Sequence, residues 1–248
     1  MAVLVITDGK IYIDGYNLSC SFNELNVDIA AEMKDTTTFC TSGTRAFIPG
    51  LQGVSFSGKA LQDFDDSVVG NQSIDHTVWD LIGASTASIM SVARQGNAMG
   101  DVAYAFKGVA AQIQPVQGAV GDLAEFTISG QSSVTRIVRG VVAALGTKVA
   151  SGTGTAFNLG PVLAGQKVYS TLHVVRPVTT GTMTVVVESD SLEAMGTPTT
   201  QLTFTQVTNA IGAQWKEAAG PITDTWWRAK WTVAGGGSYP VFVVIAVL

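Results

Sequence analysis

Two segments that alternate with a period of two residues, Phe22 to Ala30 and Leu51 to Leu61, constrain this chain most strongly. Side chains alternate across a strand, so each segment has one apolar face and one face of small or acidic residues. The first segment places Asn23, Leu25, Val27 and Ile29 on one face, against Phe22, Glu24, Asn26, Asp28 and Ala30 on the other. The pattern predicts a sheet that buries one side and leaves a wet, weakly acidic side.

About twenty residues rich in Thr, Ser, Gly and charge separate the two predicted strands. An ordinary hairpin loop has two to five residues, and long loops inside compact domains are usually functional. We therefore expect this segment to be a loop that makes a functional contact.

Composition favours a mainly β protein. Charged residues make up only 13% of the 248-residue chain, apolar residues make up 46%, and there are 27 glycines. The stretch from Ala150 to Thr155 has no bulky side chain and is typical of a boundary between domains. We predict an N-terminal β-sandwich or barrel domain over residues 1–150, with one helix from Ser73 to Ile82, followed by a C-terminal β-sandwich domain over residues 151–248.

The C-terminal part contains strand-like segments separated by short polar turns. The last of them, Tyr239 to Leu248, is apolar on both faces, which predicts a central position in its sheet. Trp227 and Trp231 fall on one face of the preceding segment and are predicted core residues. The expected strands are 168–176, 183–189, 201–208, 226–233 and 239–248.

The net charge of −5 arises entirely from the first 150 residues, which carry nine bases and fourteen acids. Residues 151–248 carry five of each. An acidic surface repels phosphate, which argues against tight nucleic-acid binding but is compatible with nucleic acid sliding past.

The motif order in the first half resembles the tail tube (major tail) proteins of long-tailed bacteriophages. DGYNLS is followed by a strand and then by KDTTTFCTSGTRAFIPGLQGVSFSG, and the resemblance extends over residues 10 to 130. It implies a tail-tube-like fold, homohexameric rings that share a continuous inner barrel of strands, and helical stacking of the rings into a tail tube used for DNA ejection.

On this resemblance, the lumen-facing residues are Glu24 and Asp28. The ring-stacking loop comprises Lys34, Asp35, Thr36, Thr37, Thr38, Phe39 and Arg45. Phe39 is expected to be an apolar anchor, and the threonine hydroxyls are expected to pair with backbone groups of the next ring. The extra residues 151–248 are expected to decorate the outside of the tube.

The resemblance also implies partners and location. The chain is expected to bind copies of itself, the tape measure and tail-tip proteins, and to let viral DNA pass without specific binding. We expect it in the virion tail, and in the host cytoplasm during assembly. Its N-terminus does not read as a signal peptide, and its longest apolar run is half of what a membrane helix needs, so no membrane association is expected.

Recognisable catalytic and metal-binding patterns are missing, so no catalytic residue, metal or cofactor is predicted. His76 and His173 lie at no metal or triad spacing, and phosphate-binding loop and nucleophile-elbow motifs are absent. A cluster of three acids reads as a solvated turn rather than a calcium site: Asp63, Asp65 and Asp66. Cys20 and Cys40 could pair, although free buried thiols are the favoured interpretation.

A possible glycan contact combines Trp226 with Arg228 and Lys230, because an exposed ring beside polar groups suits a sugar face. Packing at an edge strand is the favoured interpretation of the same residues. Two alternatives to a tail tube therefore stay open, a carbohydrate-binding module and a capsid decoration protein.

Overall fold

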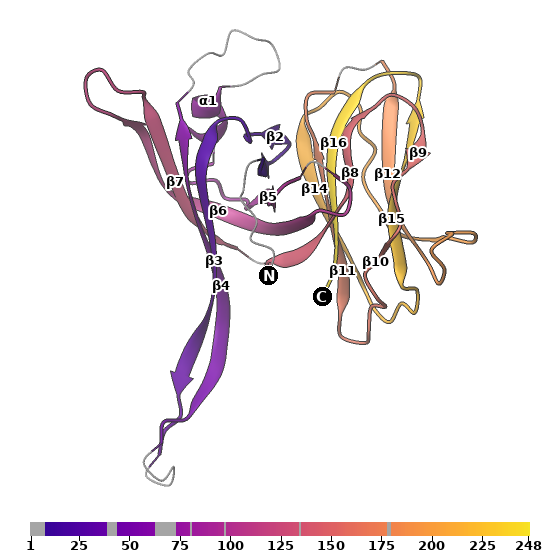
Figure 1. Cartoon of the computed structure of the whole chain (residues 1–248), viewed down its shortest axis with the longest axis horizontal. Coiled ribbons are helices and arrows are strands. Elements are labelled where there is room, and N and C mark those ends of the chain that lie inside the picture. Colours follow the sequence, from indigo (N-terminus) through magenta and orange to yellow (C-terminus); the bar gives the residue numbers. More distant parts are fainter. Residues whose placement is uncertain are drawn as a thin grey trace.

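The computed structural model describes residues 8–38, 44–62, 73–79, 81–96, 98–133, 135–177 and 180–248, and it is mainly β with one short helix (Figure 1). In chain order the elements are β1 (Lys10–Ile13), β2 (Tyr16–Asn17), β3 (Phe22–Asp35), β4 (Phe47–Leu61), α1 (Ile74–Trp79), β5 (Ser88–Ala93), β6 (Val102–Gln117), β7 (Glu125–Ser132), β8 (Val138–Lys148), β9 (Gly152–Thr153), β10 (Phe157–Asn158), β11 (Lys167–Val174), β12 (Thr182–Asp190), β13 (Thr199–Thr203), β14 (Gly212–Ala219), β15 (Trp226–Ala234) and β16 (Tyr239–Val247). The predicted β-rich fold class is confirmed, and the described residues contain one helix.

One large antiparallel sheet runs through both halves of the chain. Its order is β14-β11-β16-β8-β6-β5-β1-β2, and a branch continues from β6 through β7 and β4 to β3. Strand β8 joins the halves, because it pairs with β6 through Val138–Val141 and with β16 through Val141–Lys148. Residues far apart in sequence therefore belong to one curled sheet.

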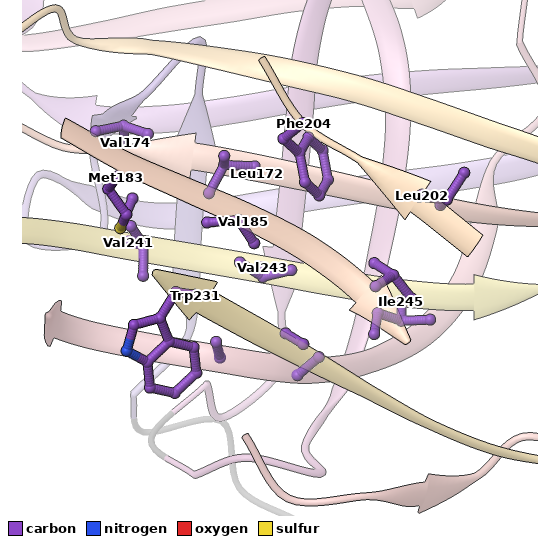
Figure 2. Close-up of a cluster of buried hydrophobic side chains, with 14 of the residues drawn as sticks. Leu172, Val174, Met183, Val185, Leu202, Phe204, Trp231, Val241, Val243 and Ile245 are labelled. Carbon is purple, nitrogen blue, oxygen red and sulfur yellow. The ribbon is translucent and has the colours of Figure 1, made fainter. Parts of the chain in front are cut away.

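The C-terminal part is a two-layer sandwich. The sheet β10-β15-β12-β13 packs against β11, β16 and β8, and the side chains between the layers form the largest buried cluster (Figure 2). Trp227 is fully buried and Trp231 nearly so, as predicted. Strand β16 lies between β11 and β8, which confirms its predicted central position.

Strands β3 and β4 form a hairpin that projects well beyond the body of the protein (Figure 1). Their ladder continues to the pair Asp35↔Phe47. The expected twenty-residue loop is therefore wrong, since only residues 36–46 lie between the strands. The alternation simply continues past Ala30, where Glu32 and Lys34 alternate with Ala31 and Met33.

A β-bulge at the start of β3 changes one predicted side-chain position. The register shifts between Phe22 and Glu24, so Phe22 lies opposite Ala60 while Glu24 lies opposite Lys59. An extra residue in one strand reverses the face of everything before it. Phe22 therefore packs on the core, edge-on to Phe126, instead of sharing a face with Glu24 as expected.

Helix α1 is shorter than predicted but begins where expected. The Ser73 Oγ accepts a hydrogen bond from the His76 backbone N–H at 3.2 Å, as an N-cap does. Val78 and Leu81 are buried against the sheet, whereas Ile82 is exposed. The helix thus closes one end of the core beneath β4, β6 and β7.

Candidate functional site

Four adjacent strands, β3, β4, β7 and β6, present one continuous polar face. Residues directly opposite one another form three rows across this face. We call it the open face and define it by the polar residues of these rows: Glu24, Lys59, Thr127 and Gln114; Asn26, Ser57, Ser129 and Gln112; Asp28, Ser55 and Gln131. The third row ends on β6 at the half-buried Val109, opposite Gln131. These side chains are exposed or half-buried.

The opposite side of the same four strands is apolar and buried. Val27, Phe56, Gly130 and Ala110 form one of its rows. The Phe56 ring lies over Gly130, where an added Cβ would come within 2.5 Å of Phe56 Cζ. Period-two alternation of this kind fixes which face is wet, because slipping the register by one residue would expose Phe56.

The open face is weakly acidic along β3, which carries Glu24 and Asp28. Glu24 accepts a hydrogen bond from Asn26 Nδ2 at 2.9 Å. Lys59 is held at the rim by Glu125, with 2.6 Å between Nζ and Oε2. Its positive charge is thereby offset by a neighbouring acid, and the remaining members of the face are small hydroxyl or amide side chains apart from Asp28. Such a surface offers no cluster of positive charge to phosphate.

Both lateral edges of this four-stranded sheet are open within the described part of the chain. Strand β3 pairs only with β4. The far half of β6, residues 111–117, pairs with β7 on one side. On the other side β5 and β8 pair with β6 only up to Gly108, and Ile82 forms an isolated parallel bridge with Ala110. Free strand edges carry unpaired backbone groups that can pair with another chain.

The projecting end of the hairpin is organised by its own hydrogen bonds. The Thr36 N–H and the Thr36 hydroxyl donate to Ala46 O at 2.8 and 3.2 Å, and Ala46 N–H donates to Thr37 Oγ1 at 3.0 Å. Hydrogen bonds from the Thr37 side chain and backbone N–H hold the pKa of Asp35 below its ordinary value. These threonine hydroxyls therefore stabilise the turn itself.

Most of the predicted ring-stacking residues thus lie together at the projecting end of the β3–β4 hairpin. Lys34 pairs with Glu32 on the hairpin, and Arg45 is exposed near the tip. Phe39 and Cys40 lie outside the described residues, as do Asp63, Asp65 and Asp66.

Exposed apolar side chains collect at two opposite ends of the four strands. One group lies on the projecting hairpin: Ile29, Met33, Phe47, Ile48 and Leu51. The other lies at the end where Leu61 pairs with Glu125, on α1, the turn after it, the end of β6 and the β6–β7 connection: Trp79, Ile82, Val116, Val120 and Leu123. Isolated exposed apolar residues are ordinary, but groups of this size mark contact surfaces.

Sequence reasoning found the β3 and β4 contributions to the open face and missed those of β6 and β7. Gln112, Gln114, Thr127 and Ser129 belong to segments predicted as strands, 100–114 and 121–130, whereas Gln131 was predicted to lie in a turn and belongs to β7. Their alternation of polar with apolar residues was a usable signal. What the sequence lacked was the pairing of these strands with β4.

The predicted glycan residues lie together on the outer face of β15, where Glu188 fixes two of them. Arg228 donates to Glu188 Oε2 from Nε at 3.0 Å and from Nη2 at 2.8 Å, and Lys230 Nζ donates to Oε1 at 2.9 Å. Trp226 is half-buried at the start of the same strand. Burial acts to raise the pKa of Glu188, but the hydrogen bonds and charges of Lys230 and Arg228 outweigh it and lower the pKa.

The histidines and the described cysteine occupy different environments. His76 is exposed on α1, as expected, whereas His173 is completely buried. Cys20 is a free, exposed thiol, so the expectation that it is buried is wrong. It lies in the turn between β2 and β3.

Within the described ranges, no group of three or more His, Cys, Asp or Glu side chains is placed to hold a metal ion. Nor do these ranges contain a helix with the length and hydropathy needed to cross a membrane.

No family model and no curated protein matches the chain. Among solved structures, it is similar to a chain of the virion of a native gene transfer agent particle, with a TM-score of 0.41 and 15% identity over 52% of this chain and 93% of that chain. A chain of the extended sheath–tube complex of an extracellular contractile injection system gives a TM-score of 0.42 and 10% identity over 56% and 93%. The Dit protein of phage SPP1, described as part of a hub adsorption apparatus, gives 0.37 and 12% over 98% and 100%.

Proposed function

We propose that this protein is a structural, non-catalytic virion protein that assembles into stacked, hexameric rings forming the tube of a bacteriophage tail. In this assembly the open face lines the channel through which DNA passes. Residues 1–150 form the ring, and the sandwich of residues 151–248 decorates its outside. The resemblance of residues 10 to 130 to tail tube proteins led to this proposal, and the geometry of the chain supports it.

One observation carries the proposal: a sheet with a largely polar face has both of its lateral edges free of a paired strand among the described residues. A single copy would leave these edges as templates for uncontrolled pairing. If β3 of one copy pairs with residues 111–117 of the next, each free edge is satisfied by a neighbour. Contacts of this head-to-tail kind close into a ring when the rotation between copies permits it.

The hairpin supplies a contact in the perpendicular direction. It projects along the strand axis, past the body, and carries exposed apolar residues together with Lys34 and Arg45. The other end of the same strands also exposes apolar residues. Rings can therefore stack with the hairpin of one ring against the opposite end of the next ring.

Negative-stain microscopy of the purified full chain tests the proposal. Hollow tubes or six-fold rings are expected. The double variant Lys34→Glu/Arg45→Glu is expected to form rings that no longer stack into tubes, because it reverses two charges at the tip. Arg176→Glu is the control, since Arg176 is exposed on the sandwich.

The proposal fails if the wild-type chain stays monomeric at high concentration or binds preformed capsid shells as monomers or trimers. The second outcome would identify a capsid decoration protein. Tubes formed equally well by the double variant would remove the hairpin from the stacking contact while leaving ring formation in place.

The outer face of β15 supports a second candidate function, glycan contact. Glu188 holds Arg228 and Lys230 in fixed positions on the strand face that also carries Trp226. Fixed polar groups beside an aromatic ring are an arrangement that can receive a sugar. Glycan-array binding by the full chain, lost in Trp226→Ala, would support this function, and absence of binding at high protein concentration would end it.

A further inference from the structure

A buried hydrogen-bond network joins strands that are distant in sequence and do not pair through their backbones. His173 on β11 contacts Ser91 on β5, with 2.9 Å between Nε2 and Oγ, and Ser91 Oγ lies 3.0 Å from Thr171 Oγ1. On the other side of the ring, His173 Nδ1 accepts a hydrogen bond from the Gly15 backbone N–H at 3.3 Å. Ser91 and His173 are completely inaccessible to solvent.

The partners determine the protonation state of the imidazole. Because Nδ1 accepts from an amide, the ring proton resides on Nε2 and is donated to Ser91 Oγ. The Ser91 hydroxyl is then free to donate to Thr171. A second proton on Nδ1 would point at the Gly15 N–H and place two donors face to face. The network therefore tolerates only the neutral ring.

The network docks the β1–β2 hairpin on the C-terminal strands. At Gly15, whose φ is +91°, an added Cβ would lie 2.5 Å from Gly212 N, so this turn packs directly on the start of β14. Beside it, the Tyr12 ring stacks on Phe242 with centroids 4.3 Å apart and lies 5.6 Å from the His173 ring. Side chains thus close the gap between β5 and β11 where no strand ladder does.

We propose that His173, Ser91, Thr171 and the Gly15 amide form an acid-sensitive latch that releases the β1–β2 hairpin from β11 and β14 when the imidazole is protonated. The β8–β16 ladder lies outside the network and stays intact in the released state. This inference does not depend on whether the protein forms a tube.

Burial gives the latch its sensitivity. It lowers the pKa of His173 from 6.5 to about 3 in the docked state. In the released state water solvates the ring, and the pKa returns toward its ordinary value. The released state therefore takes up a proton below about pH 6.5 while the docked state does not. By linkage, the opening equilibrium constant rises roughly tenfold for each pH unit between about pH 6 and pH 4.

Other titratable groups around the latch have defined effects. Burial, with a smaller contribution from Cys20, raises the pKa of Tyr12 to about 12, so Tyr12 stays neutral in this range. Burial also raises the pKa of Asp14, against hydrogen bonds from Ser88 and Ile89, and acid therefore favours the docked state through Asp14. Lys107 on β6 lies on the same face of the sheet as Ser91, and its Nζ is 5.5 Å from the Trp215 ring centroid.

Hydrogen exchange of the full chain, followed by mass spectrometry from pH 7 to pH 4, tests the latch. The Asp14→Asn background removes the opposing titration, and asparagine retains the acceptor for Ile89 and tolerates the φ of +47° at this position. The protection factor of the peptide containing Gly15 is expected to fall roughly tenfold per pH unit between about pH 6 and pH 4. Peptides of β16 should keep their protection.

His173→Asn in the same background is expected to abolish this pH dependence, and His76→Asn, at the exposed histidine, should leave it unchanged. The wild-type imidazole provides a measurement that does not need a variant. Its ¹⁵N shifts should report a proton on Nε2 alone down to pH 5. The latch is refuted if Gly15 protection is independent of pH, if β16 opens together with it, or if His173 titrates near 6.5 while Gly15 stays protected.

Discussion

Replacing Arg228 with methionine tests how much the stability of the fold depends on the partners of the buried Glu188 carboxylate. The Glu188 side chain is only 4% exposed and Arg228 is 17% exposed, so water screens this pair weakly. Removing one partner of a buried pair typically costs about 3–5 kcal/mol, because the other charge is left uncompensated. Lys230 remains 2.9 Å from the second carboxylate oxygen, so we expect a loss of about 2–3 kcal/mol.

Two further lysine variants calibrate that value. Lys230 is 44% exposed, so Lys230→Met should cost about 1 kcal/mol or less. Lys167→Met removes the exposed pair with Glu217 and should cost less than Lys230→Met, because water screens this pair. Guanidinium unfolding at pH 7 measures all three, and the Arg228→Met midpoint on heating should fall by roughly 5–10 °C.

The pH dependence gives an independent check. Because the pKa of Glu188 is lowered on folding, its ionised form stabilises the protein above the ordinary pKa near 4.5, and this contribution is lost as the pH falls through the folded value. Glu188→Gln should remove that part of the acid sensitivity. The reasoning is refuted if Arg228→Met unfolds within about 0.5 kcal/mol of wild type, or if Lys230→Met proves more costly.

Three other predictions concern the open face, the buried side of the same strands, and Cys20. Asp28→Lys should leave assembly intact but make the assembled protein retain DNA. The logarithm of the DNA-binding constant should then fall with the logarithm of the salt concentration with a slope near one per engaged lysine. Glu193→Lys on the sandwich surface is the control and should not retain DNA; equal retention by both variants would place Asp28 away from the DNA path. Gly130→Ala should lower the free energy of unfolding by about 1–3 kcal/mol in denaturant titrations, because the added methyl group would lie 2.5 Å from Phe56 Cζ and closer still to the Val109 backbone oxygen. A neutral result would mean that both the β6 backbone and the ring shift at little cost. Cys20 should react with a thiol reagent in the native protein as fast as in a short peptide, and slow modification would contradict its exposure.

Local alternation was enough to predict several features of the fold. The residues of β3 and β4 show which of their faces is buried, and the apolar residues on both faces of β16 show that it is central. The period of two is written directly into the sequence, because burial selects every second side chain of a strand. For the same reason, alternation alone places Glu24 and Asp28 on the wet face.

Features that depend on insertion or long-range pairing required the tertiary structure. The bulge that turns Phe22 to the core involves one residue and leaves no local signature. The residues that β6 and β7 contribute to the open face belong to it because β7 pairs with β4 and β6 with β7, and this pairing cannot be read from the sequence.

The same limit applies to the latch, since Ser91 and His173 are 82 residues apart and read separately as an ordinary serine and an ordinary strand histidine. Alternation is a property of neighbours along the chain, whereas strand partners are chosen by the packing of the whole core. The sequence by itself therefore determined which side of each strand is buried, and the tertiary structure decided which strands share that side.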